Sequence, residues 1–183
     1  MKQKELTEPI RSIKSINAVK SYFKKRNMRN YVIFCLGINS GLRVSDLLSL
    51  NVGDVKNKEF VLIYEKKTRK RKKFPINSKL QKIINKFTAW KKDEEPLFVS
   101  KKGSRISQSQ VYRILNCACK YVGIKENIGT HTMRKTFGYH HYRQFKDVAM
   151  LQKIFNHASP YVTLRYIGID QDEIDESYSQ FNI

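Results

Sequence analysis

The residue types most able to do chemistry in this chain are histidines, a tyrosine and an arginine in two short segments. In FNHASPYVTLRY, His157 stands nine residues before Tyr166, and the Ser-Pro pair between them predicts the start of a helix. In HTMR, His131 and Arg134 are three residues apart and would point to one face of a helix. Imidazole and phenol groups exchange protons, and a guanidinium binds anions. Alone, the second pair would equally fit two unrelated surface side chains.

A third segment, SGLRVSDLL, places Arg43 just after a glycine that is well suited to end a helix, with Asp46 one turn later. The two side chains could form an ordinary surface ion pair, which contributes little to stability. Alternatively, the carboxylate orients a guanidinium toward a phosphate, which a planar arginine fork binds through two hydrogen bonds. The sequence leaves both interpretations open.

A fourth segment, EKKTRKRKKFP, has seven basic residues among the eight at positions 66–73. Most of these side chains fit a solvated charge run that grips a DNA backbone without doing chemistry. One lysine of a β-hairpin could instead reach into a groove of the DNA as a proton donor.

The whole chain is strongly basic, with 36 Lys and Arg against 16 Asp and Glu in 183 residues. Its length predicts one domain, and a hydrophobic content of 40% is that of a globular protein. We expect a nucleic acid as the partner rather than a membrane, because a net charge of +20 attracts polyanions. No apolar run approaches the roughly 20 residues of a membrane span.

Periodicity predicts an α+β fold that is mainly helical, with a small antiparallel sheet of about three strands on one side. The predicted hairpin covers residues 59–76, and PLFVSKKG at 96–103 would add the third strand. Ser107 and Gln110 form a predicted capping box for the helix that follows. Other helices are expected at 15–26, 28–40, 79–91, 131–144, 147–155 and 160–167.

We predict a flexible N-terminal arm over residues 1–12, one main folded domain over 13–169 and an acidic tail over 170–183. The tail holds five acidic residues and no basic ones. It could fold back or dock on a neighbouring subunit, or it could form a solvated terminal helix.

Together these segments resemble the catalytic domain of the tyrosine recombinases, the phage integrase family. The resemblance covers the chain from about residue 10 to its end, and the spacing of nine residues between His157 and Tyr166 is the family's own. It is carried by GLRVSDLLSL with Arg43, KTRKRKKFP with Lys67 eight residues before Pro75, HTMR, FNHAS and TLRY.

The resemblance implies DNA cleavage through a 3′-phosphotyrosyl intermediate, with no metal or other cofactor. Tyr166 would be the nucleophile, His131 its proton acceptor or positioner, and Lys67 the proton donor to the leaving 5′-oxygen. Arg43, Arg134 and His157 would bind the nonbridging oxygens, and Asp46 would support the arginines. The alternatives are Lys66 for Lys67, and Tyr161 or Tyr178 for the nucleophile. The expected DNA contacts are Lys66, Arg69, Lys70, Arg71, Lys72, Lys73, Arg105 and Arg113.

The sequence departs from the family pattern at three places. Met133 replaces the usual leucine, FNHAS replaces LGHSS, and only 42 residues precede Arg43. That length leaves no room for the usual N-terminal core-binding domain, so we expect either a minimal enzyme or a fragment. Zinc is rejected as a use of His140 and His141, because adjacent helical residues point apart.

The expected function is site-specific recombination that integrates, excises or inverts a DNA segment, typically of a mobile element. We expect a cytoplasmic, nucleoid-associated protein, monomeric when unbound and tetrameric on synapsed DNA, with accessory DNA-bending proteins as possible partners. A DNA-binding regulator without activity, an incomplete integrase and a type IB topoisomerase remain alternatives.

Overall fold

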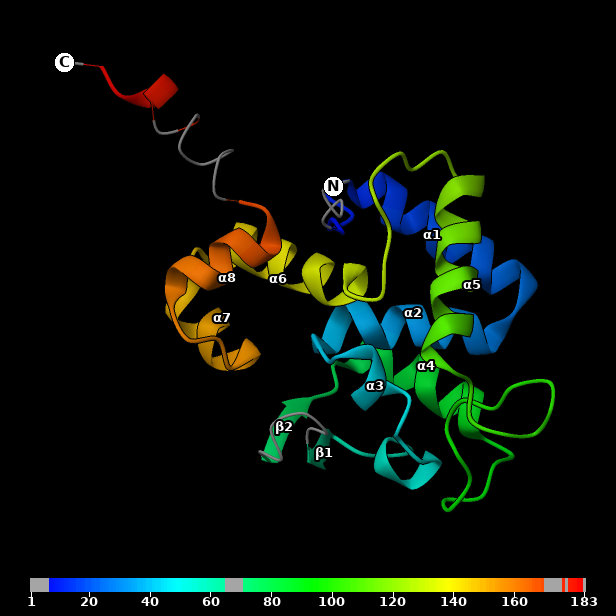
Figure 1. The fold of residues 1–183 in the computed structure, drawn as a ribbon. Coiled ribbons are helices and arrows are strands. Elements are labelled where there is room, and N and C mark those ends of the chain that lie inside the picture. The colour runs from blue at the N-terminus through cyan, green and yellow to red at the C-terminus, as the bar shows by residue number, and fades with distance from the viewer. Residues whose placement is uncertain (1–6, 65–70, 170–175, 177, 183) are drawn as a thin grey trace, which may run out of the picture.

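The computed structural model describes residues 7–64, 71–169, 176 and 178–182. It is mainly helical, as predicted, with a small antiparallel sheet on one side (Figure 1). The elements are α1 (Ile13–Arg26), α2 (Met28–Ser40), α3 (Val44–Leu47), a 3₁₀ turn (Val52–Asp54), β1 (Phe60–Tyr64), β2 (Arg71–Pro75), α4 (Ser78–Thr88), α5 (Gln108–Tyr121), α6 (Thr132–Phe145), α7 (Val148–Phe155) and α8 (Pro160–Ile167).

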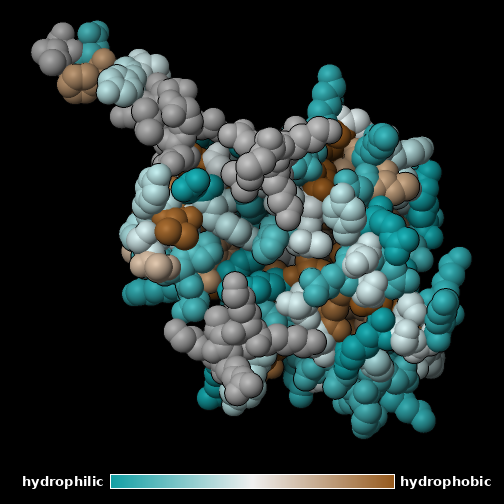
Figure 2. Space-filling view, in the orientation of Figure 1, coloured by the Kyte–Doolittle hydropathy of each residue, from teal (hydrophilic) through white to brown (hydrophobic). Residues whose placement is uncertain are grey.

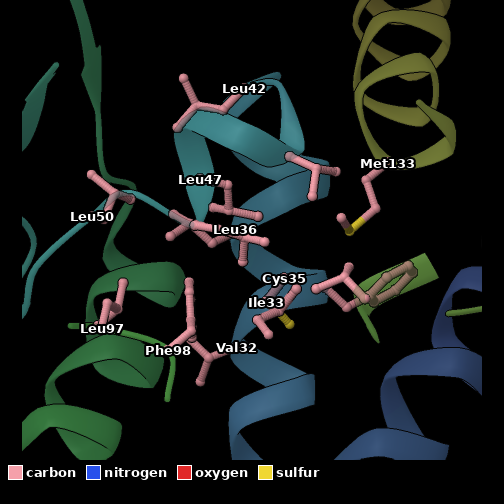
Figure 3. Close-up of a cluster of buried hydrophobic side chains, with 14 of the residues drawn as sticks. Val32, Ile33, Cys35, Leu36, Leu42, Leu47, Leu50, Leu97, Phe98 and Met133 are labelled. Carbon is pink, nitrogen blue, oxygen red and sulfur yellow. The ribbon is translucent and has the colours of Figure 1, made fainter. Parts of the chain in front are cut away.

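Helix α2 is the centre of the large core, and α1, α4 and α6 pack against it. Its apolar residues face several neighbours at once, so most of the helix is buried. Leu36 is fully buried there, and Met133 reaches the same cluster from α6 (Figure 3). The first turn of α6 is thereby fixed to the largest apolar cluster of the molecule.

A second, smaller cluster lies between α6, α7 and α8, on the opposite side of α6 from α2 in Figure 1. Gly138 allows these helices to approach closely. A Cβ atom added there would lie 2.6 Å from Ile167 and 2.7 Å from Phe155, closer than real side chains pack. The buried members of this cluster are Tyr142, Leu151, Phe155, Ile167 and Ile169.

The sheet consists of β1 and β2, paired antiparallel with Phe60 opposite Pro75 and Tyr64 opposite Arg71. The predicted hairpin is therefore confirmed, although its connection lies outside the described residues. The prediction of a third strand at 96–103 was wrong. This stretch folds into its own tight loop, in which Ser100 N–H donates to the Ser104 carbonyl, and it forms only isolated bridges.

The predicted flexible arm is also wrong for its described part, residues 7–12. Ile10 is fully buried, its N–H donates to Thr136 Oγ1, and its carbonyl lies 3.0 Å from His140 Nε2. An apolar anchor with two backbone hydrogen bonds ties this segment to α6. Helix α1 then begins at Ile13, where the Ser12 side chain caps it.

The visible face is largely hydrophilic, with hydrophobic side chains exposed only in small groups (Figure 2). Among the described helices, none is long and apolar enough to cross a membrane.

Candidate active site

Arg134 lies in the first turn of α6 and is 3% exposed. Its Nη1 donates to the Gly41 carbonyl at 2.5 Å, and its Nη2 donates to the Phe155 carbonyl at 2.9 Å. Gly41 ends α2 in the left-handed conformation (φ 60°), which presents this carbonyl to the arginine. The guanidinium therefore links the end of α2 to the end of α7, and its plane is fixed from both sides.

Arg43 immediately precedes α3, and its Nη1 lies 3.9 Å from Asp46 Oδ2. The Asp46 side chain is only 1% exposed. The surface-pair interpretation is therefore wrong, and the carboxylate holds the guanidinium from the interior. Arg43 is near enough to His157 and Tyr166 for its positive charge to act on both: it helps to lower the pKa of His157, and it opposes the rise in the pKa of Tyr166 that burial causes.

Tyr166 points from α8 toward His131, which occupies the position just before the first residue of α6. The Tyr166 hydroxyl lies 3.1 Å from His131 Nδ1. Burial raises the pKa of this phenol, while Arg134 and Arg43 act in the opposite direction. At neutral pH the hydroxyl is therefore protonated, and His131 is the group in place to receive its proton.

His157 follows Asn156, which ends α7 in the left-handed conformation (φ 53°) and turns the chain back toward α8. Its ring lies 5.0 Å from the Tyr166 ring, and its Nδ1 lies 3.1 Å from Thr163 Oγ1. Burial, then Arg134 and Arg43, lower the pKa of His157 to about 4. The imidazole is therefore neutral near pH 7.

Phe155 and Lys135 lie at the site and were not predicted from the sequence. Phe155 forms an aromatic wall, with its ring centroid 4.2 Å from Arg134 Cζ and 5.6 Å from the Tyr166 ring. Lys135 is buried, its Nζ lies 5.1 Å from the Tyr166 ring centroid, and burial lowers its pKa. Phe155 could have been suspected from its departure from the family motif. Lys135 carried no such signal among 36 cationic side chains.

The remaining predicted residues lie elsewhere in the fold or outside the described part. Lys66, Lys67, Arg69 and Lys70 belong to undescribed residues 65–70. Arg71, Lys72 and Lys73 lie on β2 and line a cavity of about 550 Å³, together with residues that include Asn156 and Lys153.

Two predicted DNA contacts differ in how their side chains are held. The Arg105 guanidinium donates to the Leu48 and Leu50 carbonyls and to Asn51 Oδ1, so it ties the loop 96–106 to the body. Arg113 lies exposed on α5, where its Nε donates to the Ser109 carbonyl at 3.3 Å.

The structure thus brings together Arg43, His131, Arg134, His157 and Tyr166, which we call the phosphate pocket. Two guanidiniums in a half-buried site suit an anionic ligand. Within the described residues, no group of three His, Cys, Asp or Glu side chains could hold a metal ion. A hydroxyl beside a proton acceptor and two fixed cations can perform nucleophilic attack on a phosphate ester.

Comparison with known proteins finds integrases and recombinases among both the family models and the related sequences. Residues 10–173 match the model of the phage integrase family. The chain is 48% identical over 177 residues to the probable integrase/recombinase YoeC of Bacillus subtilis (strain 168), covering 96% of this chain and 97% of that protein. It is 33% identical over 162 residues to tyrosine recombinase XerC of Thermodesulfovibrio yellowstonii, covering 83% and 54% respectively. The chain therefore spans nearly all of the first relative and about half of the second.

Solved structures share the fold at lower identity. The crystal structure of XerA recombinase matches with a TM-score of 0.78 and 22% identity, covering 98% of this chain and 65% of that one. A lambda integrase tetramer bound to a Holliday junction matches with a TM-score of 0.70 and 16% identity, covering 90% and 49%.

Proposed function

We propose that this chain, which belongs to the phage integrase family, is a site-specific DNA recombinase that breaks and rejoins strands through Tyr166. The observation that carries the proposal is the convergence of the Tyr166 hydroxyl, His131 Nδ1 and two arginines from separate parts of the chain. A structural tyrosine needs no such partners.

In the proposed reaction, Tyr166 Oη attacks the phosphorus of a DNA phosphodiester and its proton passes to His131 Nδ1. The bond to the 5′-oxygen breaks, and that oxygen takes a proton from Lys67, which lies outside the described residues. The products are a 3′-phosphotyrosyl ester and a 5′-hydroxyl. Attack by the 5′-hydroxyl of another strand reverses the sequence and releases Tyr166, so no energy source is required.

Arg43 and Arg134 act on the charge that develops on the nonbridging oxygens in the transition state. Their guanidiniums remain charged and are oriented in advance, one by Asp46 and one by the Gly41 and Phe155 carbonyls. Removing one such preorganised donor typically slows an enzyme by about 10²–10³-fold.

Double-stranded DNA is the proposed partner, held mainly through its phosphates. Arg71 and Lys73 are exposed on β2, and Arg113 is exposed on α5. Such contacts release counterions, so affinity should fall steeply with salt. Lys72 completes the basic side of the cavity beside the phosphate pocket.

We propose a tetramer on synapsed DNA, formed from monomers. Docking of the acidic tail 170–183 on a neighbour is part of this proposal, and most of that tail lies outside the described residues. The tetrameric state of the similar lambda integrase structure supports this assembly. Movement of a mobile element by integration, excision or inversion is the proposed biological role, and the near full-length match to an integrase/recombinase supports it.

The test is covalent trapping on nicked duplexes drawn from DNA flanking the gene. The wild-type protein should give a denaturant-resistant protein–DNA adduct, and Tyr166→Phe should give none while its DNA affinity is unchanged. Tyr161→Phe is the matched control, because Tyr161 lies exposed on the same helix.

The other outcomes separate the alternatives. Binding without an adduct on every duplex would favour a DNA-binding regulator or an incomplete enzyme. An adduct without exchange between two labelled duplexes would favour a topoisomerase.

A further inference from the structure

We propose that Thr163 is a positioning residue that fixes the tautomer of His157, and that His157 gains a proton when an oxyanion enters the phosphate pocket. The role of this proton in DNA cleavage rests on the proposed function. The positioning itself is a property of the unbound protein.

Thr163 is fully buried in α8, and its hydroxyl contacts two groups. The hydroxyl donates to the Ser159 carbonyl at 3.2 Å, and its oxygen lies 3.1 Å from His157 Nδ1. A hydroxyl has one hydrogen, and the carbonyl can only accept. With that hydrogen on the carbonyl, the short contact to the ring requires that His157 Nδ1–H donates to Thr163 Oγ1. The hydrogen of the neutral imidazole therefore sits on Nδ1, and Nε2 carries a lone pair.

The surroundings of Thr163 support a specific role for this hydroxyl. On the same face of α8 one turn later stands Ile167, and the adjoining cluster is apolar. A valine of the same shape would complete that cluster without needing hydrogen bonds. The hydroxyl therefore serves to hold His157. In a functional histidine, a hydrogen bond to one ring nitrogen commonly fixes which nitrogen carries the hydrogen.

The charged and titratable groups that face His157 come from every element around it. Arg134 approaches from α6, Arg43 from the segment before α3, and Tyr166 from α8. Both arginines disfavour a third positive charge, and burial acts in the same direction. The ring is consequently neutral while the pocket contains no anion.

A phosphodiester in the pocket reverses this balance. Its negative charge offsets the two guanidiniums and favours the imidazolium, so a proton from solvent adds to Nε2. Nε2–H then donates a hydrogen bond to a nonbridging oxygen, while Nδ1–H stays on Thr163. His157 thus becomes a donor only when its ligand is present, and binding takes up one proton.

The tautomer is tested by ¹⁵N-histidine NMR of the full chain, with His157→Gln identifying the resonances. Sulfate is the probe, because it does not itself titrate near neutral pH. We expect the Nδ1–H tautomer without sulfate, and with saturating sulfate a rise in the pKa of His157 from about 4 to about 7 or above, so that the ring gains its proton near neutral pH. An Nε2–H tautomer, or a pKa of His157 that stays well below 7 with saturating sulfate, would overturn the proposal.

The positioning role is tested by Thr163→Val and Thr163→Ser. Valine should abolish the tautomer preference and slow adduct formation by about 10–100-fold with unchanged DNA affinity, and serine should restore both. Thr88→Val is the matched control: Thr88 is equally buried, donates to the Ile84 carbonyl in the same way and lies in α4.

The two failures can be told apart. If Thr163→Val keeps the His157 tautomer, the positioning role is wrong whatever the activity. If the wild-type protein forms no adduct but the spectra behave as expected, only the proposed function is wrong.

Discussion

The two apolar clusters of the molecule differ in size and in what they hold. The large cluster surrounds α2 and includes most of the buried side chains, from Ile10 to Met133. The small cluster has five buried members between α6, α7 and α8. Arg43 follows the end of α2 on the large side, whereas His157 and Tyr166 belong to the small side. Arg134 bonds to both, through Gly41 and Phe155.

This difference suggests that the residues of the phosphate pocket fall into two groups, one that stabilises charge and one that carries the nucleophile. Groups that stabilise charge gain from rigidity, because preorganised dipoles cost no reorganisation during the reaction. A nucleophile that must be engaged and withdrawn gains from a smaller, separable support. We therefore expect α8 to move as a unit relative to α2.

The largest expected effect comes from removing one leucine from each cluster. Leu36→Ala and Leu151→Ala should each lower the free energy of unfolding by about 2–5 kcal/mol, because both side chains are fully buried. Hydrogen exchange should separate them: Leu36→Ala loosens the whole domain, and Leu151→Ala loosens chiefly α7 and α8. Equal loss of protection in α2 for both variants would contradict two separable regions.

Substitution of Arg134, which bonds to both clusters, should have the next largest effect. Arg134→Lys keeps the charge but loses the planar fork, so adduct formation should slow by about 10²–10³-fold. Arg143→Lys is the control, since Arg143 lies on the same helix and is exposed. An Arg134→Lys variant with wild-type cleavage rates would mean that the fork is dispensable.

Lowering the pH should destabilise the small cluster before the large one. The pKa of His157 is lowered to about 4 in the folded state, against about 6.5 in the unfolded chain. The neutral His157 ring therefore stabilises the folded state fully above pH 6.5. As the pH falls toward 4, the free energy of unfolding loses this contribution, which is on the order of 2 kcal/mol for a partly exposed group. Denaturation at a series of pH values should show this loss, and His157→Gln should flatten it. A wild-type profile identical to that of the variant would refute the assignment.

The smallest predicted effect concerns two helix caps with the same chemistry. Ser159 accepts the Val162 N–H at the start of α8, and Ser107 accepts the Gln110 N–H at the start of α5. Each Ser→Ala substitution should cost about 1 kcal/mol of stability. Only Ser159→Ala should also reduce adduct yield, measured at equal folded fraction. A similar reduction in Ser107→Ala would remove the distinction between the regions.

Local signals in the sequence predicted the elements well. The caps at Ser107 and Ser159, the left-handed Gly41 and the hairpin all follow from residue types at short range. Short-range preferences sufficed for these elements because each depends on neighbours in the chain. The five residues of the phosphate pocket are far apart in the sequence, and only the resemblance to the tyrosine recombinases pointed to them as a set.

Features that depend on distant partners were not predicted. Nothing local indicates that Arg134 would bond the Gly41 carbonyl, 93 positions away, or that Ile10 would be anchored to Thr136. The third strand failed because its β-forming residues found a tight loop instead of a partner strand. Thr163 looked like any helical threonine until His157 was placed beside it.

The most direct test of the account is to identify the residue that carries the DNA. Trypsin cleaves after Lys153 and Arg165, so Tyr161 and Tyr166 fall in different peptides, 154–165 and 166–183. Mass spectrometry of the digested adduct should find the nucleotide on peptide 166–183, or on the uncut 154–183, with fragmentation assigning it to Tyr166 rather than Tyr178. Attachment to Tyr161 or Tyr178 would contradict the convergence of Tyr166, His131 and the arginines on which the proposed mechanism depends.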